Sequence, residues 1–187
     1  MYTDPGYGAA VGAAYLFVAV IWLFFALIGY ALTSFFLMKI FEKAGVQGKW
    51  RAWVPVYNMM IFAKLGDISP WVMLGAIVLL IIPFLNYITW IALVVVGLMA
   101  AWRVGLKLQK EAVWVVLYFF LSIVWLGINA FDKSRWNTAI PAAPWAGNGF
   151  FSDSTQWDGI PSQVPAGGYP ANPATQAPAA GAYPPPP

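Results

Sequence analysis

The sequence contains no cysteine and no histidine, and only 9% of its residues are charged. Without cysteine the chain has no disulfide and no thiolate nucleophile. Without either residue it lacks the usual protein ligands of zinc and haem. The missing histidine also removes the most common general base in enzymes. We therefore expect a protein that is not an enzyme, with no catalytic, metal-binding or cofactor-binding residues.

The small charged fraction accompanies a hydrophobic fraction of 61% and an aromatic fraction of 18%. Soluble domains usually carry about 25% charged residues. The composition predicts a multi-pass protein of the plasma membrane. The formal net charge of +3 does not indicate nucleic-acid binding, because the basic residues flank apolar runs and form no clustered patch.

A run of 35 residues without a charged side chain extends from Ile68 to Trp102. As one helix it would measure about 50 Å, which exceeds a hydrocarbon core of about 30 Å. Pro83 removes a backbone donor in the middle of the run, and Asn86 suits the first turn of a new helix. The pattern favours two membrane spans, at about 69–82 and 86–106, joined by a tight hairpin. A single kinked helix is the alternative.

Two further apolar runs predict spans at about 13–40 and 112–131. Gly45 is the expected end of the first of these helices. The segment 50–66 alternates basic and aromatic residues and then becomes apolar for about two turns, so it predicts an interfacial or re-entrant helix. The expected fold is therefore an all-α membrane domain over 1–135, with four transmembrane helices.

A P-x-x-N pattern occurs twice, 28 residues apart, and each copy opens an apolar helix. It indicates either a duplicated half-unit or the repeated use of one helix-start signal, and we favour the second interpretation. The four residues of the pattern are the helix-break candidates: Pro55, Asn58, Pro83 and Asn86.

The distribution of Lys and Arg predicts the orientation. With four spans, eight basic residues fall on one side of the membrane and two, Lys133 and Arg135, on the other. The positive-inside rule places the eight in the cytoplasm. Both termini are then extracytoplasmic.

The segment 136–187 holds 11 of the 15 prolines, two acids and no base. Its composition predicts a flexible, disordered Pro/Ala-rich tail on the extracytoplasmic side. Aromatic side chains are costly to leave in water, and they are common anchors of protein interfaces. We expect five of them to dock onto a partner, with contact to the outer lipid headgroups as the alternative: Trp136, Trp145, Phe150, Phe151 and Trp157.

No acid or base lies inside a predicted span, which argues against a proton or ion pathway within one chain. The polar residues in the spans suit helix packing and capping. A quinone or lipid pocket lined by aromatics and one Asn is the alternative, and bound structural lipids are compatible with the sequence.

The residues 50–58, WRAWVPVYN, and the second pattern ending at Asn86 resemble a family of small bacterial membrane proteins with a W-x-x-W-x-P-x-Y-N block. The resemblance covers roughly residues 40–130 and departs where the family has a Gly-Lys pair, because Leu106 separates Gly105 from Lys107. In size and layout the chain also resembles an accessory subunit of the actinobacterial respiratory supercomplex of cytochrome bcc and cytochrome oxidase.

That second resemblance implies a non-catalytic role, in which helices fill a groove between larger subunits and the tail clamps them from outside. We therefore expect an accessory or assembly subunit of a larger membrane complex, most plausibly the respiratory supercomplex, with larger membrane subunits and lipids as partners. The alternative is a small oligomeric transporter or channel with its site at the Pro/Asn helix breaks.

Overall fold

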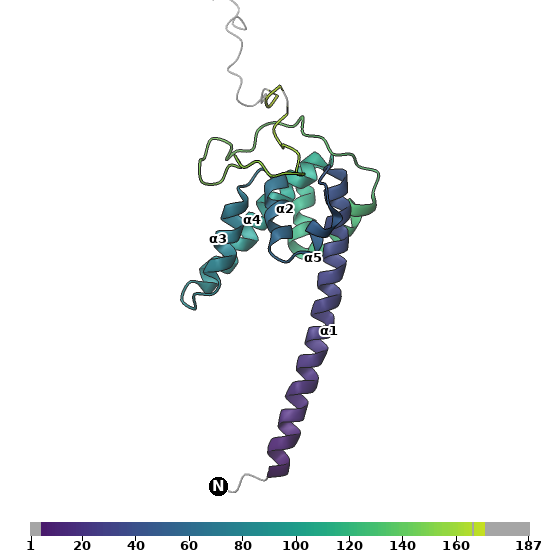
Figure 1. Cartoon of the computed structure of the whole chain (residues 1–187), viewed down its shortest axis with the longest axis vertical. Coiled ribbons are helices and arrows are strands. Elements are labelled where there is room, and N and C mark those ends of the chain that lie inside the picture. Colours follow the sequence, from purple (N-terminus) through teal and green to yellow (C-terminus); the bar gives the residue numbers. More distant parts are fainter. Residues whose placement is uncertain (1–4, 166, 171–187) are drawn as a thin grey trace, which may run out of the picture.

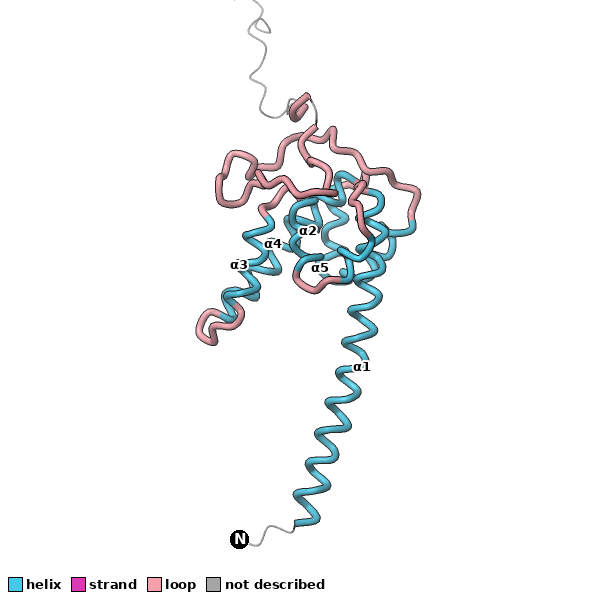
Figure 2. The backbone as a smooth tube through the Cα atoms, in the orientation of Figure 1, coloured by secondary structure: helices cyan, strands magenta, loops and turns pink. Residues whose placement is uncertain are grey.

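The computed structural model describes residues 5–165 and 167–170, and these residues form helices and loops without a β-strand. The predicted all-α class is confirmed (Figures 1 and 2). The elements in chain order are α1 (Pro5–Lys43), the 3-10 helix η1 (Lys49–Trp53), α2 (Tyr57–Leu65), α3 (Pro70–Leu79), α4 (Asn86–Lys107), the 3-10 helix η2 (Ala112–Trp114) and α5 (Val115–Phe131).

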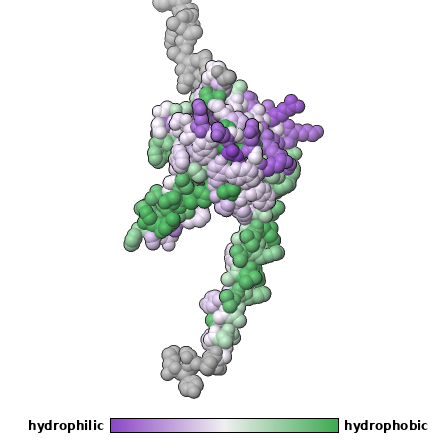
Figure 3. Space-filling model, viewed as in Figure 1, coloured by the Kyte–Doolittle hydropathy of each residue, from purple (hydrophilic) through white to green (hydrophobic). Residues whose placement is uncertain are grey.

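Three helical segments are long and apolar enough to cross a membrane by length and composition: Gly6–Lys43, Asn86–Lys107 and Ala112–Phe131. Pro70–Leu79 is apolar but shorter. Hydrophobic residues cover the middle of the projecting part of α1 and much of the α3–α4 hairpin, whereas hydrophilic residues gather at the opposite end of the molecule (Figure 3). These features are compatible with insertion into a membrane.

Helix α1 has 39 residues and is therefore about 58 Å long. Its C-terminal part packs against α5 and η1, and the remainder projects away from the other helices (Figure 1). It ends close to the predicted stop. Gly45 has φ 77°, and the Val46 N–H donates a 2.9 Å hydrogen bond to the Phe41 carbonyl, which closes the last turn.

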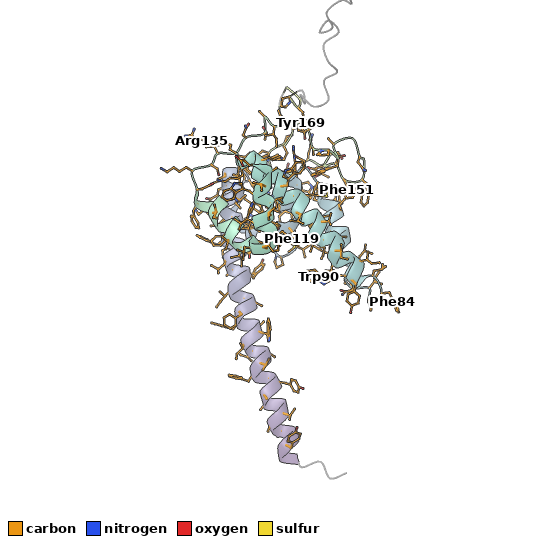
Figure 4. All side chains as sticks on the ribbon, turned by 180° about the vertical axis from the view of Figure 1, so that it is seen from behind. Phe84, Trp90, Phe119, Arg135, Phe151 and Tyr169 are labelled. Atoms are coloured by element: carbon orange, nitrogen blue, oxygen red, sulfur yellow. The ribbon has the colours of Figure 1, made fainter. Side chains whose placement is uncertain are left out.

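The run 68–102 forms two helices, as predicted. Helix α3 begins at Pro70 and α4 begins at Asn86, with turns between them over 80–85. Phe84 lies at the tip of this hairpin and is 92% exposed (Figure 4). The hairpin interpretation is therefore confirmed over the single kinked helix.

The segment 50–66 becomes η1 and α2, and α2 lies in the middle of the molecule. It contacts α1, α3 and α4, and its residues 60–65 are all buried. Their neighbours in the hydrophobic core include Ile40, Val104 and Trp125. The second half of the predicted interfacial segment is thus covered by the chain's own helices.

The run 112–131 turns back on itself, so that its two ends lie close together. Leu121 interrupts α5 with non-helical angles (φ −139°, ψ 60°). Lys110 precedes the run and forms an ion pair with Asp132, which follows it. A straight 20-residue helix would hold its ends about 30 Å apart. The structure thus differs from the predicted single crossing over 112–131, and the four-span count is not confirmed.

The first part of the C-terminal segment packs on the helices, where the sequence predicts disorder. Ser69 N–H donates to the Phe151 carbonyl at 2.8 Å, and Ile68 forms an isolated antiparallel bridge with Ser152. The loops over 132–165 lie across the end of the molecule opposite to the projecting end of α1 (Figure 2). Residues 171–187 of the predicted flexible tail lie outside the described residues.

Candidate functional site

The end of the molecule under the C-terminal loops holds a set of buried and partly buried ion pairs, which we call the ionic cap: Lys43, Lys64, Asp67, Arg103, Lys107, Lys110, Asp132 and Asp153. The sequence places most of its cations on helix ends. Arg103 and Lys107 are four residues apart near the end of α4 and therefore share one face of the helix.

Asp67 is the centre of the ionic cap. Its Oδ2 accepts a hydrogen bond of 2.6 Å from Arg103 Nε, and its Oδ1 accepts one of 2.5 Å from Lys107 Nζ. All three side chains are buried, with exposed fractions of 6%, 2% and 0%. Burying a charge is costly unless it is paired and hydrogen-bonded, so each of the three groups depends on the others.

The C-terminal segment completes the hydrogen bonding of these groups. Lys107 Nζ also donates to the Leu65 carbonyl at 2.6 Å and to Gln163 Oε1 at 3.1 Å. Arg103 donates through Nη2 to the Pro141 carbonyl at 3.0 Å. The cations of α4 are therefore satisfied by residues from two distant parts of the chain.

Lys64 at the end of α2 is a second point of attachment for the C-terminal segment. Its ammonium group is 2.6 Å from Asp153 Oδ2 and 2.9 Å from Thr155 Oγ1, and it also donates to the Thr155 carbonyl. The side chains of Lys64 and Asp153 are buried. Between this pair and the loops lies a polar cavity of about 790 Å³.

Asp132 joins the ends of α1, α4 and α5. Its Oδ1 accepts from Lys43 Nζ at 2.7 Å and from Ser134 Oγ at 2.5 Å, and Lys110 pairs with its other oxygen. Burial by itself raises the pKa of the Asp132 carboxyl, but the hydrogen bonds from Lys110, Lys43 and Ser134 outweigh it and hold that pKa well below its usual value. A depressed carboxyl pKa contributes stability that is present above the unfolded pKa of about 4 and is lost as the pH falls below it.

The five aromatic residues predicted to bind a partner divide into two groups. Three tryptophans pack against this chain's own core: Trp136, Trp145 and Trp157. Phe150 is 68% exposed, and Phe151 is partly buried beside it with ring centroids 5.0 Å apart. Of the set, Phe150 is thus the most accessible to a partner.

The three tryptophans make specific contacts with the ionic cap. Trp145 Nε1 donates to the Asp67 carbonyl at 2.9 Å, and the Lys107 ammonium lies 5.7 Å from the ring centre of Trp136. The Lys64 ammonium lies 5.8 Å from the ring centre of Trp157, which also stacks on Tyr57 with a centroid distance of 5.6 Å. These contacts explain why residues rich in proline and alanine nevertheless dock on the helices.

The helix-break candidates share one local geometry. Asn58 Nδ2 donates to the Ala52 carbonyl at 3.1 Å, and Asn86 Nδ2 donates to the Leu80 carbonyl at 3.2 Å. Each acceptor lies six residues before its asparagine, so both copies of the P-x-x-N pattern, which begin at Pro55 and Pro83, close a turn in the same way. This common bond is compatible with both interpretations of the pattern, a repeated helix-start signal and a duplicated half-unit.

An apolar cavity of about 770 Å³ lies among the helices, and residues of α1, α2, α3, α4 and α5 line it. Its lining includes Asn58 and the aromatic side chains of Trp90, Tyr118 and Phe119. Trp90 and Phe119 lie on the side of the molecule away from the C-terminal loops (Figure 4). No Lys, Arg, Asp or Glu among the described residues lines this cavity.

The described part of the chain contains no group of three or more acidic side chains placed to hold a metal ion. The four-residue spacing of Arg103 and Lys107 places both on one face of a helix, but the sequence gives no sign of the partner of these cations. Asp67 follows Gly66 in a short polar stretch and has no spacing relation to α4. Its only local signal is that it is the single acid between Lys43 and Glu111 in sequence.

No known protein family matches this sequence, and neither a characterised protein nor a solved structure matches the chain.

Proposed function

We propose that this chain is a non-catalytic accessory or assembly subunit of a larger complex in the plasma membrane. The observation that carries the proposal is the isolation of α1. None of the residues in its most hydrophobic window is buried. Within the described residues α1 has no contact with α3 or α4.

An isolated apolar helix of this length suits a role in assembly. Membrane helices associate through close packing of side chains, and a helix that its own chain leaves uncovered offers its whole circumference to a neighbour. Side chains exposed on α1 include Phe17, Trp22 and Phe25. In this proposal α1 packs against a larger subunit, while the C-terminal loops stabilise the chain's own ionic cap.

The choice of a cytochrome bcc–cytochrome oxidase supercomplex as the partner rests on the resemblance of size and layout alone. The transporter alternative gains no support from the helix breaks. The amide groups of Asn58 and Asn86 both donate to backbone carbonyls of this chain, so they are engaged in local structure.

Photocrosslinking along α1 tests the proposal. A photoreactive amino acid in place of Trp22, which is 73% exposed, is expected to crosslink to a larger membrane protein that also co-purifies with the chain in mild detergent at a fixed ratio. The same probe in place of Phe41, which is 3% exposed, is the matched control and is expected to give no intermolecular product. Haem absorption in the purified complex supports a respiratory partner. Crosslinks at Trp22 to lipid alone, or to a second copy of this chain, contradict the accessory role.

We further propose that the cytoplasm lies on the side of the ionic cap. Under the positive-inside rule the cations of the ionic cap define this side. The C-terminal loops pack on the same cations, so they share that side, whereas the projecting end of α1 lies at the opposite end of the molecule (Figure 1). This orientation replaces the expectation that both termini are extracytoplasmic.

Single-cysteine labelling checks the orientation directly, because the native chain has no cysteine. Ala10→Cys near the start of α1 is expected to react with a membrane-impermeant maleimide on intact cells. Ser154→Cys in the C-terminal loops is expected to react only after the membrane is permeabilised. Both positions are exposed, so their accessibility in the folded chain is matched. Labelling of Ser154→Cys on intact cells contradicts the orientation.

A further inference from the structure

The apolar cavity has the size of a ligand site and is open on one side. Its volume of about 770 Å³ falls within the range of about 300–1,000 Å³ that is usual for small-molecule pockets. Side chains from all five α-helices line it, including Tyr30 of α1, Met73 of α3 and Gly97 of α4. Apolar surface of this extent is unfavourable in contact with water and is better covered by hydrocarbon.

The hydrogen-bonding groups of the cavity are partly engaged and partly free. The Tyr30 hydroxyl donates to the Trp53 carbonyl at 2.8 Å, and the Asn58 amide donates to the Ala52 carbonyl at 3.1 Å. The Tyr118 hydroxyl makes no hydrogen bond with any residue that the structure describes, and it faces Gly97 across the cavity wall. The hydroxyl groups of Thr33 and Ser122 also line the cavity, so Tyr118 is one of three hydroxyl donors without a described hydrogen bond among mainly hydrocarbon surfaces.

The absence of charged lining residues among the described residues restricts the chemistry of an occupant. A phosphate or carboxylate placed in such a site would be buried without a counter-ion, which is strongly unfavourable. An uncharged oxygen that accepts one hydrogen bond meets no such penalty. A hydrocarbon chain next to that oxygen would cover the apolar lining.

We propose that this cavity binds one lipid-like molecule, with its hydrocarbon part against the helices and an uncharged carbonyl oxygen that accepts a hydrogen bond from Tyr118. Two membrane components carry this chemistry, the acyl ester of a phospholipid and the ring carbonyl of a prenylated quinone. The inference does not depend on the proposed accessory role, because the cavity is formed by this chain alone.

Two variants separate the contribution of the cavity volume to binding from that of the hydrogen bond. A Cβ at Gly97 would lie 3.8 Å from the Tyr118 hydroxyl, an ordinary contact, so Gly97→Leu extends its side chain into the cavity without a clash at Cβ. Tyr118→Phe removes only the hydroxyl. Gly75→Leu is the matched control, because Gly75 also lies in an apolar helix but has nothing within 4 Å and does not line the cavity.

The test is native mass spectrometry of the full chain in detergent, titrated in one arm with decylubiquinone and in the other with palmitoyl-oleoyl-phosphatidylcholine. In at least one arm the unmodified chain is expected to bind a single molecule at saturation. Gly97→Leu is expected to weaken that binding at least tenfold, and Tyr118→Phe about three- to tenfold, the usual effect of one lost hydrogen bond. Gly75→Leu is expected to bind as the unmodified chain does.

The arm that shows single-site binding identifies the source of the carbonyl. Equal binding by the unmodified chain, Gly97→Leu and Tyr118→Phe in both arms overturns the proposal, as does the absence of a single-site adduct in either arm. Thermal unfolding without added lipid shows whether Gly97→Leu folds. If it does not fold, the nearly isosteric Tyr118→Phe decides the question by itself.

Discussion

Replacing Asp67 with alanine is expected to destabilise the folded chain by about 3–5 kcal/mol, the usual cost of removing one partner from a buried ion pair. The substitution leaves Arg103 and Lys107 buried beside each other without an anion. It also places alanine at φ 61°, a left-handed conformation that costs about 1–2 kcal/mol for most residues. Thermal unfolding in detergent, followed by tryptophan fluorescence, measures the effect.

Asp67→Asn separates the charge from the backbone conformation, because asparagine tolerates left-handed angles and keeps the shape of the side chain. We expect Asp67→Asn to lose most of the stability that Asp67→Ala loses. Asp158→Ala is the matched control, since this acid is exposed and only its carbonyl takes part in a described bond, with Arg51. An unfolding temperature of Asp67→Asn equal to that of Asp158→Ala would show that the ion pairs do not stabilise the fold.

Gly66→Ala is the second substitution with a large expected effect. A Cβ at this position would lie 2.5 Å from Ala100 Cα and 2.9 Å from the Ala100 carbonyl oxygen. Backbone atoms cannot move aside as a flexible side chain can, so α2 and α4 must separate. Overpacking of this kind usually costs about 1–3 kcal/mol, and contact with backbone places the expected loss at the upper end.

Gly75→Ala provides the comparison, because the same methyl group would meet nothing within 4 Å in α3. We expect its unfolding temperature to equal or slightly exceed that of the unmodified chain, given the better helix propensity of alanine. The φ of Gly66 is −87°, a value that alanine adopts freely, so a loss at this position reports the contact between helices. Equal stability of the two variants would contradict the close approach of α2 to Ala100.

The elements that follow from local rules could be predicted from the sequence. Pro83 and Asn86 divide the long uncharged run because a proline breaks a helix wherever it stands in the interior. Gly45 ends α1 because a glycine readily adopts the positive φ of a helix C-terminus. Both signals act within a few residues and need no knowledge of the remainder of the fold.

The path of 112–131 could not be predicted, because it depends on contacts between distant residues. By length the run satisfies the rule for a span. Its return brings Asp132 to Lys110 and to Lys43, which lies 89 residues earlier in the sequence. No periodicity or spacing relates two residues so far apart.

The docking of the C-terminal segment was missed for a similar reason. A composition rich in proline and alanine predicts disorder. Composition does not show that a few residues of the segment have specific partners elsewhere in the chain. Asp153 binds Lys64, and Trp145 binds the Asp67 carbonyl. The sequence therefore identifies the aromatic anchors, but three of them pack within this chain.

The ion pairs of Asp132 also have a consequence for the order of events during synthesis. Proteins are made from the N-terminus, so α1 and Lys43 leave the ribosome well before Asp132 does. The run 112–131 is long and apolar enough to be a candidate span by length and composition. Both cations that bind Asp132 are therefore already present when it emerges, so its ion pairs can close as soon as the end of α5 has been made, before the rest of the C-terminal segment is available to dock.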